Sequence, residues 1–326
     1  MTDTQFQALP ARSKVPRTCS FFLAVWLMHC SACAQEVPQA STADTAKRTT
    51  SFTPPERTVG EDWPTFLGPR ADGSSSQIGV DPATWQPIPP LRWSLPLGIS
   101  YGAPTIVAGR LYQFDRYANA ERLTCYAAES GRELWHWEKE VRYDDRFGYN
   151  NGPRCSPIVD DGRVFLYGVT GNLSCVDAES GQLYWTKDLN TEYAVVPNFF
   201  GVASNPYVHE NLLLVMVGGS TPATRGLPTE RLADVRPNGT AVVAFDKSNG
   251  DEVYRLGDGL ASYASLVVQP VAGRDTGLAF LRDGLLGWEP TSGEVLFEFP
   301  WRAPMLESVN AALPVVVDSN VLISEA

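Results

Sequence analysis

The residues best suited to bind a ligand are aromatic, amide and arginine side chains that stand just before segments predicted to be strands. Seven of them are assigned a ligand-binding role: Tyr101, Asn151, Arg154, Asn198, Phe200, Tyr263 and Asn310. Aromatic faces combined with amides and one guanidinium suit a polar or glycan-like ligand. The alternative is that these side chains hydrogen-bond neighbouring structural units and have no ligand.

No catalytic constellation accompanies these residues in the sequence. His29 lies in a predicted leader, His136 at a strand end and His209 in a turn position. No nucleophile elbow, phosphate-binding loop or zinc motif occurs. Asp144 and Asp145 could bind a hard cation, but two adjacent carboxylates without further spaced ligands are typical of a solvated turn. We therefore predict no catalytic residue and no metal site.

The N-terminus has the three parts of an export signal. Residues 12–17 are basic, Phe21–Met28 is apolar, and Ala32-Cys33-Ala34 fits the small-residue cleavage rule. We predict cleavage after Ala34 and an exported chain, periplasmic or extracellular. The apolar run is short for a transmembrane helix, so no span is predicted. A lipid anchor at Cys33 is the weaker alternative.

Composition and charge indicate which partners and sites are expected in the chain after the predicted leader. Residues 35–61 are rich in Ser, Thr, Ala and Pro and are predicted to be a disordered linker. The full chain has a net charge of −11, which repels phosphate backbones and argues against nucleic acid as a partner. Cys125, Cys155 and Cys175 follow the leader without metal-type spacing and are predicted to be small, buried strand residues.

A repeat defines the architecture. Leu123–Trp135 is echoed by Leu173–Trp185, a displacement of 50 residues with Cys, Ala-Glu-Ser-Gly and Trp in register. Further copies are Val243–Tyr254 and Leu286–Phe297, and each copy follows a predicted strand pair such as Ser156–Phe165. Four short antiparallel strands per repeat, at a period of roughly 40–50 residues, are typical of propeller blades.

The repeat motif has a direct physical interpretation. The acidic residues Asp177 and Asp246 can bond their own backbone, and the turn glycines supply positive φ between the third and fourth strands. The aromatic residue that ends each copy is predicted to fill the space between blades. The residues assigned to this structural motif are Gly131, Trp135, Asp177, Gly181, Trp185, Asp246, Gly250 and Gly293.

One repeat contains an insertion between Val217 and Thr240, predicted to be a surface excursion. A long loop on a rigid scaffold can carry function, and a blade also tolerates such an insertion neutrally. The sequence leaves both readings open.

These motifs resemble the pyrroloquinoline-quinone-like (PQQ-like) propeller repeat family, which includes quinoprotein alcohol dehydrogenases and BamB. The stretch Asp62–Gly73 looks like the opening of exported members from planctomycete-type bacteria. The resemblance covers residues 62–326 and implies an all-β propeller of four-stranded antiparallel blades, with four to five blades present. Because family members have seven or eight blades, we predict a C-terminally truncated ring; a complete small propeller or an arc completed by another chain are the alternatives.

The resemblance also suggests which functions to compare with the sequence. Quinoprotein dehydrogenases hold Ca²⁺ through Glu and Asn, use an Asp base, and stack the quinone between a Trp and a disulfide of adjacent cysteines. No Cys-Cys pair occurs in this sequence. We therefore predict a non-catalytic binding or scaffold module for a protein or polysaccharide partner, without a cofactor. The alternatives are a PQQ-dependent oxidoreductase with PQQ and Ca²⁺, and a BamB-like outer-membrane assembly factor.

Overall fold

A computed structural model describes residues 60–79, 81, 83, 91–305 and 309–325. The chain divides into two units, Met1–Thr50 and Ser51–Ala326, and the described residues belong to the second. The predicted leader and almost all of the predicted linker lie outside them. In the described ranges, neither of the short helices has the length and apolar character needed to cross a membrane.

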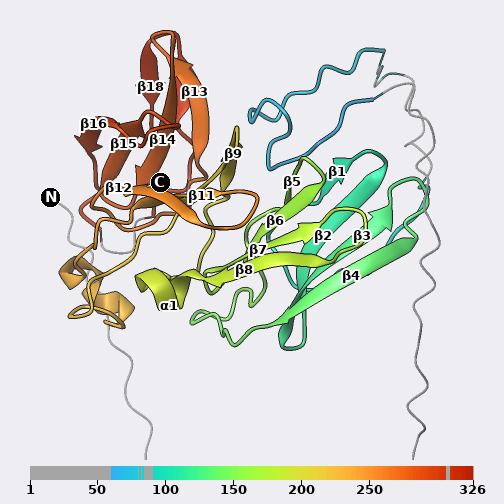
Figure 1. The fold of residues 1–326 in the computed structure, drawn as a ribbon, viewed down its shortest axis with the longest axis horizontal. Coiled ribbons are helices and arrows are strands. Elements are labelled where there is room, and N and C mark those ends of the chain that lie inside the picture. Colours follow the sequence, from blue (N-terminus) through green and yellow to red (C-terminus); the bar gives the residue numbers. More distant parts are fainter. Residues whose placement is uncertain (1–59, 80, 82, 84–90, 306–308, 326) are drawn as a thin grey trace, which may run out of the picture. The chain divides into compact units, whose positions relative to one another are not determined.

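The described part of the chain is all-β, as predicted, with four four-stranded antiparallel sheets and one two-stranded sheet (Figure 1). Blade 1 contains β1 (Thr105–Val107), β2 (Arg110–Tyr117), β3 (Ala120–Ala127) and β4 (Glu133–Glu140). Blade 2 contains β5 (Ile158–Asp160), β6 (Arg163–Tyr167), β7 (Asn172–Asp177) and β8 (Leu183–Asp188). Blade 3 contains β9 (Tyr207–His209), β10 (Leu212–Met216), β11 (Val242–Asp246) and β12 (Glu252–Leu256). Blade 4 contains β13 (Val267–Val271), β14 (Arg274–Leu281), β15 (Gly284–Trp288) and β16 (Val295–Pro300). The two-stranded sheet contains β17 (Val315–Val317) and β18 (Asn320–Leu322).

Within each blade the strands pair in chain order, which is the blade topology that the repeat predicts. The third and fourth strands are joined by the Gly turn. Oδ1 of Asp177 accepts hydrogen bonds from the backbone N–H groups of Glu179 (3.1 Å) and Ser180 (2.7 Å), and Gly181 has a φ of 75°. An aspartate that bonds its own turn and a glycine in the left-handed region together close this hairpin.

Each turn glycine lies against an aromatic ring that comes earlier in the chain, at the end of the preceding repeat or, for the first glycine, before the first repeat. A Cβ atom at Gly181 of blade 2 would lie 2.5 Å from Cε3 of Trp135 in blade 1. The same pairing recurs as Trp93 on Gly131, Trp185 on Gly250 and Tyr254 on Gly293. Because glycine has no side chain, the ring lies directly against the turn backbone of the next blade. The recurrent Gly and aromatic positions therefore form one inter-blade contact.

The core lies between neighbouring blades. Phe165 and Tyr167 of β6 pack with Leu213 of blade 3, whereas Val164, on the opposite face of β6, packs with Tyr112 of blade 1. Successive side chains of a strand point to opposite faces, so an inner strand buried on both faces can be apolar at consecutive positions. This explains the apolar runs Leu212–Met216 in β10 and Val242–Phe245 in β11.

The insertion between Val217 and Thr240 packs back onto the blades in part. Its short 3₁₀ helix, η2 (Thr229–Asp234), contributes the buried Leu232, which packs with Phe199 and Leu260. The other helix, α1 (Leu189–Tyr193), follows β8. The insertion is thus anchored beside the loops that lead into blades 3 and 4.

Candidate functional site

The seven predicted ligand-binding residues all lie in the loops that lead into the first strands of the sheets. Four of them, Tyr101, Arg154, Phe200 and Tyr263, line one cavity of about 320 Å³. Phe66 and Ser265 line it as well. We call this cavity, defined by these six residues, the aromatic pocket. It is formed because loops distant in sequence converge where successive blades begin.

Phe66 reaches the pocket from a segment that crosses the first strands of blades 1 and 2. The backbone N–H of Trp63 donates to the carbonyl of Ile106 in β1 (2.7 Å), and the N–H of Val159 in β5 donates to the carbonyl of Pro64 (2.8 Å). These bonds attach the segment to the edges of two sheets. The repeat pattern did not predict the contribution of Phe66, because this residue precedes the first repeat.

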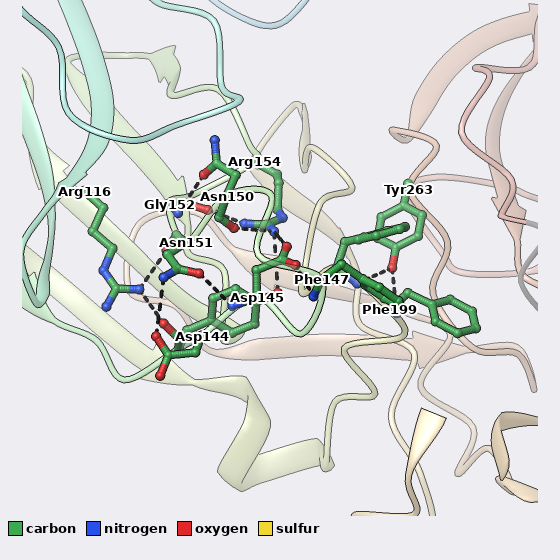
Figure 2. A network of polar contacts seen from close by, with 12 residues as sticks. Arg116, Asp144, Asp145, Phe147, Asn150, Asn151, Gly152, Arg154, Phe199 and Tyr263 are labelled. Atoms are coloured by element: carbon green, nitrogen blue, oxygen red, sulfur yellow. Dashed lines mark hydrogen bonds and ion pairs between the residues drawn. The ribbon is translucent and has the colours of Figure 1, made fainter. Parts of the chain in front are cut away.

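Arg154 is the charged residue of the pocket, and it is held by a dense network (Figure 2). Its Nη2 atom contacts Oδ2 of Asp145 at 2.8 Å, and the two side chains are 5% and 0% exposed. The guanidinium also donates to the backbone carbonyls of Asn150 and Gly152, and it lies 5.7 Å from the ring centre of Tyr101. The prediction of a solvated turn is therefore wrong for Asp145, because a buried arginine neutralises its carboxylate.

The loop that carries Asp145 is further fixed by Asn151 and Arg116. Oδ1 of Asn151 accepts from the backbone N–H of Asp145 (2.7 Å), and Nη1 of Arg116 donates to the carbonyls of Asn151 (2.8 Å) and Tyr143 (2.6 Å). Figure 2 shows these side chains facing one another across the loop. Asn151 thus holds the loop in shape, and it does not line the pocket.

Asn198 and Asn310 also make structural hydrogen bonds. Nδ2 of Asn198 donates to the carbonyl of Ala261 (2.7 Å), and Nδ2 of Asn310 donates to that of Leu281 (2.7 Å). Their Oδ1 atoms are buried without a hydrogen-bond partner among the described residues. For these amides, the geometry favours the alternative that the sequence left open, in which they join neighbouring blades.

Tyr263 connects the pocket to an aromatic cluster. Its Oη atom accepts hydrogen bonds from the backbone N–H groups of Phe199 and Phe200, both at 2.9 Å. Burial is the main cause that raises the pKa of Tyr263 to about 12, so its hydroxyl stays protonated at neutral pH. The tyrosine therefore fixes the backbone of the neighbouring loop and keeps its own proton.

A row of aromatic rings leads from Tyr263 to the surface. Ring centres are 5.6 Å apart for Phe200 and Tyr263, 5.4 Å for Phe147 and Phe200, and 6.1 Å for Phe147 and Tyr149. Phe147 is 48% and Tyr149 70% exposed. We call Phe147, Tyr149 and Phe200 the aromatic face. The sequence analysis considered Asp144 and Asp145 of this loop but assigned no role to Phe147 or Tyr149.

A calcium–quinone site of the quinoprotein type needs a disulfide between adjacent cysteines and carboxylate and amide ligands for the metal ion. No group of three or more His, Cys, Asp or Glu side chains in the residues that the structure describes is placed to hold a metal ion. Cys125, Cys155 and Cys175 are each buried and free, on β3, before β5 and on β7. The carboxylate of Asp145, beside the aromatic pocket, is engaged by Arg154. The separate cysteines and the carboxylate paired with Arg154 do not fit the quinone and its calcium ion.

Comparisons with known proteins place the chain in a family. A curated relative, the quinohemoprotein alcohol dehydrogenase ADH-IIG of Pseudomonas putida, is 23% identical over 175 residues, which are 51% of this chain and 21% of that protein. Among solved structures, BamB from Moraxella catarrhalis matches with a TM-score of 0.40 and 16% identity over 65% of this chain and 56% of its own. A quinohemoprotein alcohol dehydrogenase from Comamonas testosteroni matches with a TM-score of 0.40 and 14% identity over 74% of this chain and 49% of its own.

The chain thus spans about a fifth of the curated relative and about half of each solved structure. The family model described as "Outer membrane protein assembly factor BamB" matches residues 119–326, more than half of the chain. This match covers all four turn glycines and the residues that form the aromatic face. The chain therefore belongs to the PQQ-like β-propeller repeat family of the outer membrane protein assembly factor BamB.

Proposed function

We propose that the chain is an exported, non-catalytic binding module that docks a protein partner on the aromatic face. The observation that carries this proposal is the exposure of Phe147 and Tyr149 on a loop whose backbone is held by the buried carboxylate of Asp145. Large aromatic residues on a rigid support bind at a low cost in conformational entropy, which is why they are enriched at interface hot spots.

The insertion supports this loop from the other side. Arg146 contacts the side chains of Thr229 and Glu230 in η2, so the residue before Phe147 is tied to the insertion. Arginine beside exposed aromatic rings is a common composition for a protein interface. Export of the chain is expected from the predicted leader. A protein partner has a precedent in the matching family model, which is described as an outer membrane protein assembly factor.

Site-specific photo-cross-linking tests this function. A photoreactive phenylalanine analogue is placed at position 149 of the full chain, expressed in its native host, and compared with the same analogue at Tyr184. Tyr184 is the matched control because it is 48% exposed on the outer strand β8, in blade 2. With the analogue at position 149, we expect one discrete cross-linked product that is heavier than the chain. This product should disappear when Phe147→Ala is introduced into the same chain. Equal patterns at both positions would contradict docking on the aromatic face.

A quinone-dependent oxidoreductase is the alternative from another functional class. Incubating the chain with PQQ and Ca²⁺ and measuring dye-linked alcohol oxidation separates the two. We expect no turnover above that of the heat-denatured chain. Saturable PQQ binding accompanied by alcohol oxidation would overturn the non-catalytic reading and favour the dehydrogenase relatives.

A further inference from the structure

The insertion between Val217 and Thr240 forms one wall of a cavity of about 530 Å³. Insertion residues within Leu232–Pro237 line this cavity, together with the segments before β15 and after β16. We call this space the insertion cavity, and it shares no lining residue with the aromatic pocket. The insertion, which departs from the repeat, therefore builds a cavity on the rigid blades, and such additions often carry function.

Three arginines from separate segments line the insertion cavity: Arg236 in the insertion, Arg282 between β14 and β15, and Arg302 after β16. Arg236 is exposed and has no ion pair among the described residues. Arg282 is 4% exposed, and burial together with the positive charge of Arg302 lowers its pKa. The cavity therefore gathers like positive charges, although the chain as a whole has a net charge of −11.

Two carboxylates balance part of this charge. Nε of Arg302 is 3.6 Å from Oδ1 of Asp283, and Nη1 of Arg302 is 4.0 Å from Oε1 of Glu325. Both contacts are longer than a hydrogen bond, so these two carboxylates act on Arg302 through their charge. Asp234, in the insertion, is engaged by Arg231 at 2.8 Å. In the described part of the chain, the three guanidinium groups of the cavity thus face two carboxylates, and one further negative charge would balance them.

The rest of the cavity wall is largely apolar. Leu232, Val235 and Leu260 are each at most 5% exposed, and Met305 is 65% exposed. Such a wall favours a ligand that removes apolar surface of its own from water. Inorganic phosphate has no apolar part, and a dianion would exceed the positive charge that the two carboxylates leave unbalanced. A monocarboxylate with an apolar chain satisfies both conditions.

We infer that the insertion cavity binds a small monocarboxylic acid with an apolar body, such as a medium-chain fatty acid. Its carboxylate accepts hydrogen bonds from the guanidinium groups of Arg236 and Arg302, because the fork of an arginine matches a carboxylate. Arg282 adds positive charge from the buried side, and the apolar body packs against the leucine and valine wall. The inference does not rest on the proposed protein docking, because no residue of the aromatic face lines the insertion cavity.

Isothermal titration calorimetry on the full chain tests the inference with three probes: hexanoate, hexan-1-ol and inorganic phosphate. We expect hexanoate to bind with a Kd on the order of 1 mM at low salt. The other two probes should bind at least tenfold more weakly, because hexan-1-ol lacks the charge and phosphate lacks the apolar chain. Equal binding of hexan-1-ol would overturn the role of the arginines, and tighter binding of phosphate would overturn the apolar ligand class. An absence of hexanoate binding would overturn the inference as a whole.

The tripeptide Gly-Gly-Leu distinguishes a free acid from the end of a polypeptide, because its carboxylate also lies beside an apolar side chain. We expect it to bind more weakly than hexanoate, since its peptide groups would be placed against an apolar wall without hydrogen-bond partners. Tighter binding of the tripeptide would overturn the assignment of a free acid.

Two variants place the site. Arg236→Gln removes an exposed guanidinium and should weaken hexanoate binding about tenfold. Arg225→Gln is the matched control, because Arg225 is an exposed arginine of the same insertion that does not line the cavity, and hexanoate binding should be unchanged. Arg302→Lys keeps the charge but loses the planar fork, so affinity should fall while the urea-unfolding curve shows a folded chain. Hexanoate binding that survives both Arg236→Gln and Arg302→Lys would contradict the inference, as would an equal loss in Arg225→Gln.

Discussion

Replacing Asp145 by asparagine isolates the charge of the buried ion pair. Asparagine is nearly isosteric and can keep the hydrogen bond that Asp145 Oδ1 accepts from the backbone N–H of Phe147 (2.8 Å). What it removes is the negative charge 2.8 Å from Nη2 of Arg154, at a side chain that is 0% exposed. The substitution therefore leaves a buried guanidinium without its counter-charge.

The magnitude follows from this geometry. Breaking a buried ion pair by removing one partner costs about 3–5 kcal/mol. Arg154 keeps the carbonyls of Asn150 and Gly152 as acceptors, so we expect the lower end, about 3 kcal/mol. Arg154→Met alone leaves the buried carboxylate of Asp145 without its counter-charge and should lower the free energy of unfolding by a similar amount. The double variant should cost clearly less than the sum, with a coupling energy of about 2 kcal/mol.

Urea unfolding of the four proteins, followed by tryptophan fluorescence, measures this double-mutant cycle. Equal m-values across the set are the control that the free energies of unfolding are comparable. A loss below about 1 kcal/mol for Asp145→Asn, as for an exposed ion pair, would refute the reasoning. Additive losses would do the same.

Three further predictions concern the turns, the N-terminal loop and the cysteines. In urea unfolding, Gly181→Ala should destabilise the chain by about 2 kcal/mol more than Gly162→Ala. Both glycines have φ near 70°, but a Cβ atom at Gly181 would meet an aromatic ring, whereas nothing lies within 4 Å of a Cβ atom at Gly162. Equal losses in the two variants would contradict this. Glu61 accepts hydrogen bonds from Arg70 (2.7 Å) and from the backbone N–H of Ser76 (2.8 Å), and the bond from Arg70 is the main cause that lowers the pKa of Glu61 to about 2. The bond to Ser76 should therefore persist as the pH falls through 4.5 and be lost only near pH 2, and an NMR titration of the Ser76 amide with a midpoint near 4.5 would be incompatible with this. Burial raises the pKa of the Cys155 thiol, so peptide mapping after iodoacetamide treatment at pH 8 should find it labelled only in urea; labelling of the folded chain would show that the thiol is accessible.

The repeat could be predicted from the sequence because its determinants are local. A turn glycine and an aromatic residue at fixed spacing follow from the hairpin geometry of one blade, so Gly181 and Trp185 were identified together. The aromatic residue was also predicted to fill the space between blades. Which residue it would meet there was not predicted: the contact of Trp135 with Gly181 of the next blade depends on how blades stack and has no signal within one repeat.

The candidate site was predictable in part. Tyr101, Arg154, Phe200 and Tyr263 meet because each precedes the first strand of a blade, and these starting points converge in space. The partner of Arg154 was missed because an Asp-Asp pair has the pattern of a solvated turn, and burial of one carboxylate depends on tertiary packing.

The most direct test of the central claim is the affinity of the cross-linked protein partner for chains altered on the aromatic face. The Phe147→Ala/Tyr149→Ala double variant should bind that partner at least tenfold more weakly than the parent chain, because it removes both exposed rings, while its urea-unfolding midpoint stays within the error of the parent. An affinity within twofold of the parent would contradict the account, since the fixed aromatic loop would then not be the docking surface.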